Sequence, residues 1–328
     1  MKLSKTGIKV LSAQYRSVLK KCLLINLGIL AFPAMLSAAV LEDGIQNSSG
    51  QYTSINIDGK KPASIIDSKI IGGENDNFVF NDSEITIKNS DLETKGNVSI
   101  TSSVISYSCA SGNCEPDADG PGDGFLGTNV SIKDSTLTMG ETGNSQDYAY
   151  VGANKIFSIE NSNITLNANA VLAYEGAIEE QGIGEFSISN NSSLTLNEKS
   201  SLRIGEPDNL STAPLKISDS AITLNDESYI SFYGNKEKTE ITNSQITLND
   251  ASYISLNDLI LTNAEIKMKD TSTLEIANVV LDNASKIKGN KNKVSFSGDV
   301  DFAGFFDPAT ADVSGSLSRG GYDDEITY

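Results

Sequence analysis

One phrase of ten residues recurs along the chain and limits what it can fold into. The phrase opens with an apolar–polar–apolar triplet, continues with Asn or Asp and then Ser or Ala, and closes on Ile or Leu, Thr and an apolar residue. Copies lie at 130–139, 157–166, 186–196 (with one extra residue), 215–224, 239–248 and 259–268, with weaker copies at 78–87 and 98–105. Such self-similarity indicates a repeat architecture, in which each unit buries its apolar face against its neighbours.

Each half of the phrase predicts a short strand with one buried face, because apolar and polar residues alternate. In the copy at 215–224, Leu215 and Ile217 are expected to point inward, followed by Ile222 and Leu224. A third apolar pair follows each copy and predicts a third short strand. These third strands are expected at 202–204, 229–232, 254–256 and 274–276.

The spacing between equivalent apolar residues predicts the topology. The first and second strands are five residues apart and the second and third are eight apart, as in Ile217, Ile222 and Ile230. The step to the next first strand varies, so two corners are fixed and one tolerates insertions. We expect an all-β fold, a parallel β-helix with three short strands per coil of 20–30 residues. Ile222, Ile246 and Ile266 should then lie in single file, ~4.8 Å apart. A β-sandwich is the alternative, but it does not account for the constant offsets.

The corners carry residues that suit tight bends. Asn tolerates the left-handed backbone conformation and can hydrogen-bond along a stack. The first bend repeats Asn161, Asp219, Asn243, Asn263 and Asn283. The position after the second strand repeats Asn167, Asn197, Asn225 and Asn249. The Thr of the phrase should form an outward column of Thr165, Thr195, Thr223 and Thr247. We interpret all these positions as structural.

The first 39 residues have the features of an export signal. Six basic residues precede an apolar run at 22–32, and Pro33 and the small residues Ser37, Ala38 and Ala39 follow. A basic start, a short apolar stretch and a small-residue exit are typical of a secretory signal peptide. We expect cleavage after Ala38 or Ala39. An uncleaved anchor is the alternative, since 22–41 is uncharged and nearly long enough to span a membrane.

The charge balance and the missing residue types exclude several functions. The 328 residues include 25 Lys and Arg, 43 Asp and Glu and no His, for a net charge of −18. Phosphate binding needs a basic surface, so no nucleic-acid partner is expected. The lack of His excludes His-dependent catalytic triads, the HExxH zinc site and His general-base catalysis.

The basic leader, the acidic Asn-, Ser- and Thr-rich body and the degenerate coils together resemble the passenger region of a bacterial autotransporter. The resemblance implies a right-handed, pectin-lyase-like β-helix, carried across the inner membrane and then displayed on the outer membrane or released. We expect a signal peptide at 1–39, a passenger-like domain at 40–303 and a short Gly- and Asp-rich tail, disordered, at 304–328.

The chain departs from the family because a complete member ends in a membrane β-barrel, for which the tail has no room. We therefore expect a truncated passenger, the first piece of a split gene, or an exported β-helix that uses another route. Any association with the outer membrane would then need a missing or separate barrel.

Two cysteines and an acidic stretch lie in one long insert. Cys109 and Cys114 enclose a short Gly-containing loop, and export permits disulfides, so we expect these two to pair. Two free thiols and a redox site are the alternatives. Asp117, Asp119 and Asp123 offer oxygen ligands for calcium, but the spacing of an EF-hand is not met. We interpret this stretch as a solvated turn.

The outward residues of the predicted third strands do not form a paired-carboxylate site, because they read Arg203, Ser231, Ser255 and Glu275. We therefore expect no enzyme and assign no catalytic residue, cofactor or metal ligand. Inserts at the tolerant corner should form one acidic edge, with Glu175, Glu179, Glu180, Glu185, Glu206 and Asp208.

The function we expect is that of a secreted or outer-membrane surface protein. It would act as an adhesin-like or structural contact protein on a host protein or glycan. The alternatives are a glycan-active β-helix enzyme, a lyase or hydrolase, and a fragment without independent function.

Overall fold

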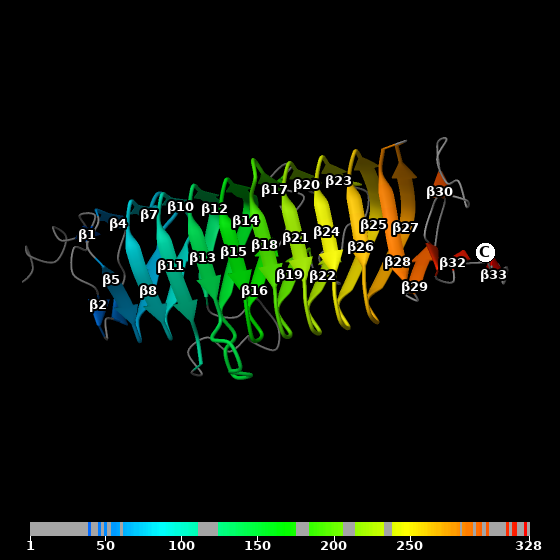
Figure 1. Ribbon diagram of the computed structural model, residues 1–328. Coiled ribbons are helices and arrows are strands. Elements are labelled where there is room, and N and C mark those ends of the chain that lie inside the picture. The colour runs from blue at the N-terminus through cyan, green and yellow to red at the C-terminus, as the bar shows by residue number, and fades with distance from the viewer. Residues whose placement is uncertain are drawn as a thin grey trace, which may run out of the picture.

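The computed structural model describes residues 54–59, 62–110, 124–174, 184–205, 214–232, 238–282, 284–290, 293–296 and 300–301. It also gives the backbone of short strands at 39–40, 45–46, 49–50, 313–314, 317–319 and 325–326. All regular elements in these ranges are strands, stacked across a long axis (Figure 1). No helix among the described residues has the length and hydropathy to cross a membrane. The predicted leader and tail lie outside these ranges, apart from strand backbone.

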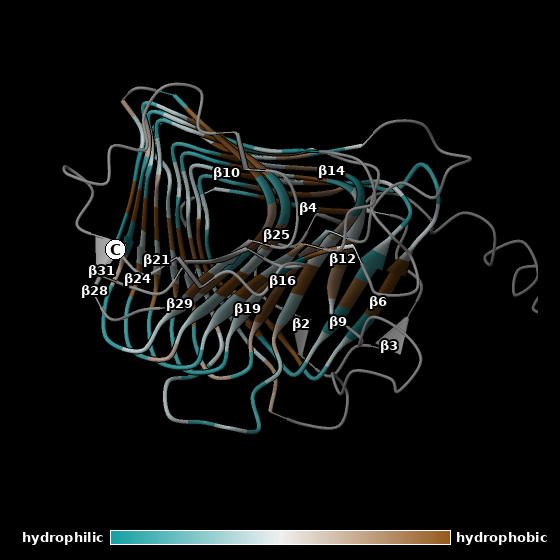
Figure 2. Ribbon diagram, turned by 90° about the vertical axis from the view of Figure 1, so that its right-hand side faces the viewer, coloured by the Kyte–Doolittle hydropathy of each residue, from teal (hydrophilic) through white to brown (hydrophobic). Residues whose placement is uncertain are grey.

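The strands form three parallel stacks, so the molecule has a three-sided profile along its axis (Figure 2). The first stack contains β1 (Ala39–Val40), β4 (Ile55–Asp58), β7 (Phe78–Asn81), β10 (Asn97–Thr101), β17 (Glu185–Ser189), β20 (Leu215–Ser218), β23 (Lys238–Thr242) and β30 (Val300–Asp301). The second contains β2 (Ile45–Gln46), β5 (Ala63–Ile66), β8 (Glu84–Lys88), β11 (Val104–Ser108), β13 (Thr136–Met139), β15 (Asn163–Leu166), β18 (Ser193–Leu196), β21 (Ala221–Leu224), β24 (Gln245–Leu248), β26 (Glu265–Met268), β28 (Lys286–Asn290) and β31 (Val313–Ser314). The third contains β3 (Ser49–Gly50), β6 (Lys69–Gly72), β9 (Asp91–Thr94), β16 (Val171–Tyr174), β19 (Ser201–Ile204), β22 (Tyr229–Phe232), β29 (Lys293–Phe296) and β32 (Leu317–Arg319).

Four long strands run through the third corner and belong to both the third and the first stack. They are β12 (Phe125–Lys133), β14 (Tyr150–Glu160), β25 (Tyr253–Thr262) and β27 (Thr273–Leu281). They join these two stacks into one sheet, while the second stack is a sheet of its own. The short β33 (Glu325–Ile326) pairs with β32 and is the one antiparallel strand among those described.

The predicted fold and register are confirmed. Ile222 pairs with Ile246, and Ile246 pairs with Ile266, so these residues occupy one file on neighbouring coils. All three side chains are at most 2% exposed. Residues that hydrogen-bond between neighbouring coils are 32 positions apart at Asn97 and Asn129 but 20 apart at the C-terminal end, as at Asn243 and Asn263. The extra length before Asn129 lies between β11 and β12, so the second corner also accepts insertions, contrary to the prediction that only the third corner does. The interior files nevertheless stay in register.

The first corner turns through a single residue with positive φ. Asn161, Asp219, Asn243 and Asn263 have φ between 46° and 49°, as the sequence predicts, while Asn283 lies outside the described residues. The next residue is usually a buried Ser. Its hydroxyl accepts a hydrogen bond from the backbone N–H of the equivalent Ser on the previous coil. Such bonds link Ser83 to Ser103, Ser103 to Ser135, Ser135 to Ser162, Ser162 to Ser192 and Ser220 to Ser244, at 3.1–3.2 Å.

The prediction for the second corner is half wrong. The amide of Asn225 donates to the Asn197 side chain at 2.8 Å and accepts from Asn249 at 2.8 Å, so the expected ladder along the stack exists. The left-handed residue, however, is the one after each Asn, such as Glu198 or Asp226. The backbone N–H of the Asn donates to a carbonyl of the preceding coil, as from Asn225 to Leu196 at 2.9 Å.

Candidate functional site

The outward side of the third stack, here called the third-strand face, carries charged, aromatic and hydroxyl side chains. Register places Arg203, Ser231, Ser255 and Glu275 in one outward file on neighbouring strands, which confirms the predicted column. A parallel file two residues earlier contains Ser201, Tyr229, Tyr253 and Thr273. The alternation of the strands explains both files, because every second residue points away from the core.

Arg203 is held in place by its neighbours on this face. Its guanidinium carbon lies 5.6 Å from the ring centre of Tyr229 on the next strand, within the range of a cation–π contact. Its Nε donates a hydrogen bond to the Ser201 hydroxyl at 3.1 Å. A cation with these two partners is oriented before any ligand arrives.

Tyr253 and Glu275 form the other half of the site. The Tyr253 hydroxyl donates to the Glu275 carboxylate at 2.8 Å, and both side chains are half-buried. Between the two pairs lies Ser231, which is 5% exposed and whose hydroxyl has no hydrogen-bond partner within the described part of the chain. A buried hydroxyl without a partner costs free energy, and its burial also keeps it out of reach of a ligand.

The N-terminal end of the third-strand face carries a second group of charges. Lys69 lies 2.9 Å from the carboxylate of Asp91, which is 3% exposed. Glu93 lies two residues further along β9, so it projects from the same face. This strand therefore presents two carboxylates side by side, one of them already paired with a lysine.

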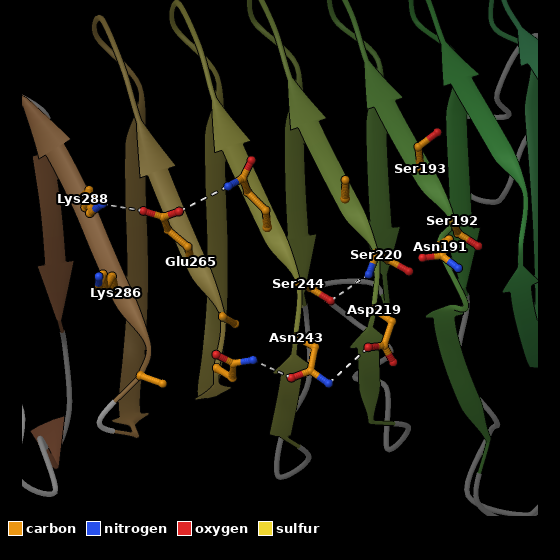
Figure 3. Close-up of a pocket in the computed structure, with 15 residues that line it drawn as sticks. Asn191, Ser192, Ser193, Asp219, Ser220, Asn243, Ser244, Glu265, Lys286 and Lys288 are labelled. Carbon is orange, nitrogen blue, oxygen red and sulfur yellow. Dashed lines mark hydrogen bonds and ion pairs between the residues drawn. The ribbon is translucent and has the colours of Figure 1, made fainter.

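A shallow groove follows the first corner on its second-strand side (Figure 3). Its volume is about 670 Å³, and it is lined mainly by corner Asn, Asp and Ser residues of successive coils. The Asn263 amide donates to Asn243 at 2.9 Å, and Asn243 donates to Asp219 at 3.1 Å. These side chains are already bonded to one another along the stack, so the groove is a structural ladder more than a preformed binding pocket.

Glu265 is the acidic group at the C-terminal end of this groove. Its carboxylate lies 2.8 Å from Lys288 and 3.2 Å from Lys267, and it accepts a bond from Gln245 at 3.2 Å. The hydrogen bond from Lys288 lowers the pKa of Glu265, against an opposing effect of burial, and Lys267 lowers the pKa further. A general acid needs a raised pKa to hold its proton near neutral pH, so Glu265 is not suited to that role.

The predicted cysteine site is described only in part. Cys109 is 1% exposed and disulfide-bonded, and its backbone N–H donates to the buried Asp147 carboxylate at 2.7 Å. Cys114 lies outside the described residues, so the pairing of the two stays a prediction. The acidic stretch with Asp117, Asp119 and Asp123 also lies outside them. Within the described ranges, no three His, Cys, Asp or Glu side chains are placed to hold a metal ion.

The acidic edge predicted at the third corner is represented by Glu185, whose carboxylate lies 3.3 Å from Lys216 on the next coil. Glu175, Glu179, Glu180, Glu206 and Asp208 lie outside the described residues. The outward Tyr229 and Tyr253 do not figure in the sequence prediction. The signal was present, since each stands one position before the apolar pair of a predicted third strand.

Comparisons with models of known families, with curated proteins and with solved structures give no match for this chain.

Proposed function

We propose that the protein is an exported, surface-associated contact protein with an adhesin-like role, and that its third-strand face binds a glycan. The observation that carries this proposal is the row of positioned side chains on that face, Arg203, Tyr229, Tyr253 and Glu275. They lie on strands of a rigid solenoid, which is the kind of scaffold that holds a binding surface in shape.

The chemistry of this row suits a sugar. A tyrosine offers a flat apolar ring face and a polar hydroxyl tip, which match the C–H face and the hydroxyl rim of a pyranose. The guanidinium donates up to five hydrogen bonds and the carboxylate only accepts them. One end of the row therefore suits acceptor groups of a sugar, and the other end suits its donor groups. Tyr229 and Tyr253 stand on strands ~4.8 Å apart. That step is close to the length of one sugar unit in an extended polysaccharide.

The row is also ordered before binding. Arg203 is fixed by Ser201 and the Tyr229 ring, and Tyr253 is fixed by Glu275. Side chains that are already immobile lose little conformational entropy when a ligand binds, and that lowers the cost of association.

Export is the second part of the proposal, and the leader supports it. A basic start followed by an apolar run and small residues is what a secretory signal needs. We infer a passenger-like protein that works outside the inner membrane. N-terminal sequencing of the chain recovered from the culture medium or the cell surface should begin after Ala38 or Ala39. A chain that keeps its first residues and stays in the cytoplasm would refute this part.

Glycan binding is tested with the purified chain on a glycan array, followed by titration calorimetry on the glycans that bind. Changing Tyr229 and Tyr253 to Ala should weaken binding about tenfold or more, since each ring supplies stacking area. The control is Ser187→Ala, which alters an outward position on the first stack. A wild-type chain that binds no glycan, or a double variant that binds as well as the control, would refute the proposal.

One observation favours a second candidate, a glycan-active enzyme. Asp91 and Glu93 project from the same face of β9 with Cα atoms about 6.6 Å apart. Glycoside hydrolases use two carboxylates that flank the scissile bond, so a pair of carboxylates on one face is the arrangement that this chemistry requires. Incubating the chain with acidic and neutral polysaccharides should then release reducing ends, and Glu93→Gln should abolish the release. If the wild-type chain releases none, this candidate is removed.

A further inference from the structure

The outward side of the second stack, here called the second-strand face, carries an unusually regular file of hydroxyl groups. The strands that carry this file stack side by side (Figure 1), and each residue of the file pairs in register with the next one on the neighbouring coil. The file consists of Ser64, Thr86, Ser106, Thr138, Thr165, Thr195, Thr223 and Thr247. All are exposed or half-exposed.

The hydroxyls of this file are not used by the described part of the chain. The serine hydroxyls of the first corner bond between coils, whereas those of Thr165, Thr195 and Thr223 have no partner among the described residues. Free hydroxyls both donate and accept, so a surface made of them is complementary to a second copy of itself.

The centre of the second-strand face is also uncharged, in a chain whose net charge is −18. From β13 to β24, both outward positions of every strand hold neutral residues. These positions are Thr136 and Thr138, Asn163 and Thr165, Ser193 and Thr195, Ala221 and Thr223, and Gln245 and Thr247. Two acidic molecules repel each other, and this strip is a place where they can approach without opposing like charges.

The two ends of the face carry opposite charges. Towards the C-terminus, Lys267, Lys286 and Lys288 surround the single carboxylate of Glu265. Towards the N-terminus, Glu84 is exposed on β8, and the corner residue before that strand is Asp82. Lys88 lies at the far end of β8, beyond the hydroxyl file.

We propose that a second copy of this chain docks on the second-strand face, antiparallel, about a two-fold axis that runs along β18. In this arrangement β8 of one copy faces β28 of the other, and β13 faces β24. Glu84 then lies opposite Lys286 of the second copy, in the same outward column, at both ends of the interface. Thr195 lies near the axis and faces its own equivalent.

The exposed side chain of Val104 also favours docking on the second-strand face. It is 51% exposed and stands on the same face, in the outward column between Glu84 and Thr136. Docking would remove this apolar surface from water.

The size of the face sets the strength of the contact. Nine strands from β8 to β28 extend over about 38 Å, and a four-residue strand is about 13 Å long. The interface would bury about 500 Å² on each copy, or about 1,000 Å² in all, which is at the lower limit for a specific protein–protein contact. We therefore expect a weak, reversible dimer whose population depends on concentration.

Sedimentation velocity of the purified chain over the micromolar range tests the proposal. The wild type should shift from monomer to dimer as its concentration rises. Thr195→Glu should stay monomeric, because two carboxylates would meet at the axis. Ser187→Glu adds the same charge on the first stack and should still dimerise. Circular dichroism checks that both variants are folded. A wild type that is monomeric throughout, or a Thr195→Glu variant that dimerises like the control, would overturn the proposal.

A charge exchange tests the antiparallel register. Lys286→Glu and Glu84→Lys should each weaken the dimer several-fold, since each places like charges opposite one another at both ends. The double variant should restore the dimer. If the double variant is weaker than either single variant, the register is wrong. Neither result depends on glycan binding, because the residues proposed for that role lie on the third-strand face.

Discussion

The Ser244 hydroxyl accepts a hydrogen bond from the backbone N–H of Ser220, 3.1 Å away on the preceding coil. The same hydroxyl donates to the carbonyl of Thr242 at 2.7 Å, and both serines are less than 9% exposed. One small side chain thus satisfies a buried donor on one coil and a buried acceptor on its own. Repeated along the first corner, this contact joins successive coils at a place where the ladder of the strands is interrupted.

Replacing Ser244 by Ala should destabilise the protein. The backbone N–H of Ser220 would be left buried without an acceptor, which costs roughly 1–3 kcal/mol. The free energy of unfolding in urea measures the loss. Ser187→Ala, at an outward position without such a role, should change it by less than about 0.5 kcal/mol. An equal effect of both substitutions would contradict the structural role of the serine file.

Thr239 interrupts a column of apolar residues, and its replacement by Val should stabilise the protein. Thr239 is fully buried between Leu215 and Leu259 on the neighbouring strands, and its hydroxyl has no hydrogen-bond partner among the described residues. Val has nearly the same shape and no polar group to desolvate, so we expect a gain of about 1 kcal/mol. Thermal unfolding detects it as a higher Tm. A lower Tm would mean that the hydroxyl is used.

Asp282 should make stability depend on pH. The hydrogen bond from the Ser285 hydroxyl, together with those from the backbone N–H groups of Asn263, Ala284 and Ser285, lowers the pKa of Asp282, although burial opposes the effect. A carboxyl with a lowered folded-state pKa stabilises the fold above its ordinary pKa. This stabilisation is lost as the pH falls through the folded-state value.

The wild type should therefore exceed Asp282→Asn in urea midpoint at neutral pH, and the difference should shrink below about pH 4. The amide of the variant keeps the shape of the side chain without titrating. A difference that grows on acidification would contradict the assigned direction of the pKa shift.

We expect reduction of the cysteine pair to change the mass of the intact chain. Cys109 is disulfide-bonded, and Cys114 is the cysteine expected to be its partner. The intact chain should gain the mass of two hydrogens on reduction, and a peptide containing both cysteines should carry the linkage. A mass that reductant leaves unchanged would contradict the pairing.

The sequence predicts this fold well because the solenoid repeats one local rule. Offsets of five and eight residues place Ile217, Ile222 and Ile230 on three different stacks, and the same offsets recur at Ile241, Ile246 and Ile254. A prediction based on a single coil would be ambiguous, since a short apolar run suits many folds. The repetition removes the ambiguity.

The site was less predictable for a physical reason. Tyr229 and Tyr253 become neighbours because two coils stack, so their contact depends on register and not on distance along the chain. The position of Arg203 over the Tyr229 ring depends in turn on side-chain conformation. At the second corner, the pattern identifies Asn225 but does not reveal that Asp226 takes the strained conformation.

Changes in the length of the third corner alter the surface of this protein and leave its interior unchanged. Between Phe232 and Lys238 the chain leaves one coil and enters the next, and the strands on either side keep their partners whatever the length of the connection. Foreign peptides of different lengths could thus be grafted there without altering the interior files of the coils. Each grafted peptide would then be displayed at a fixed position along the axis of the solenoid.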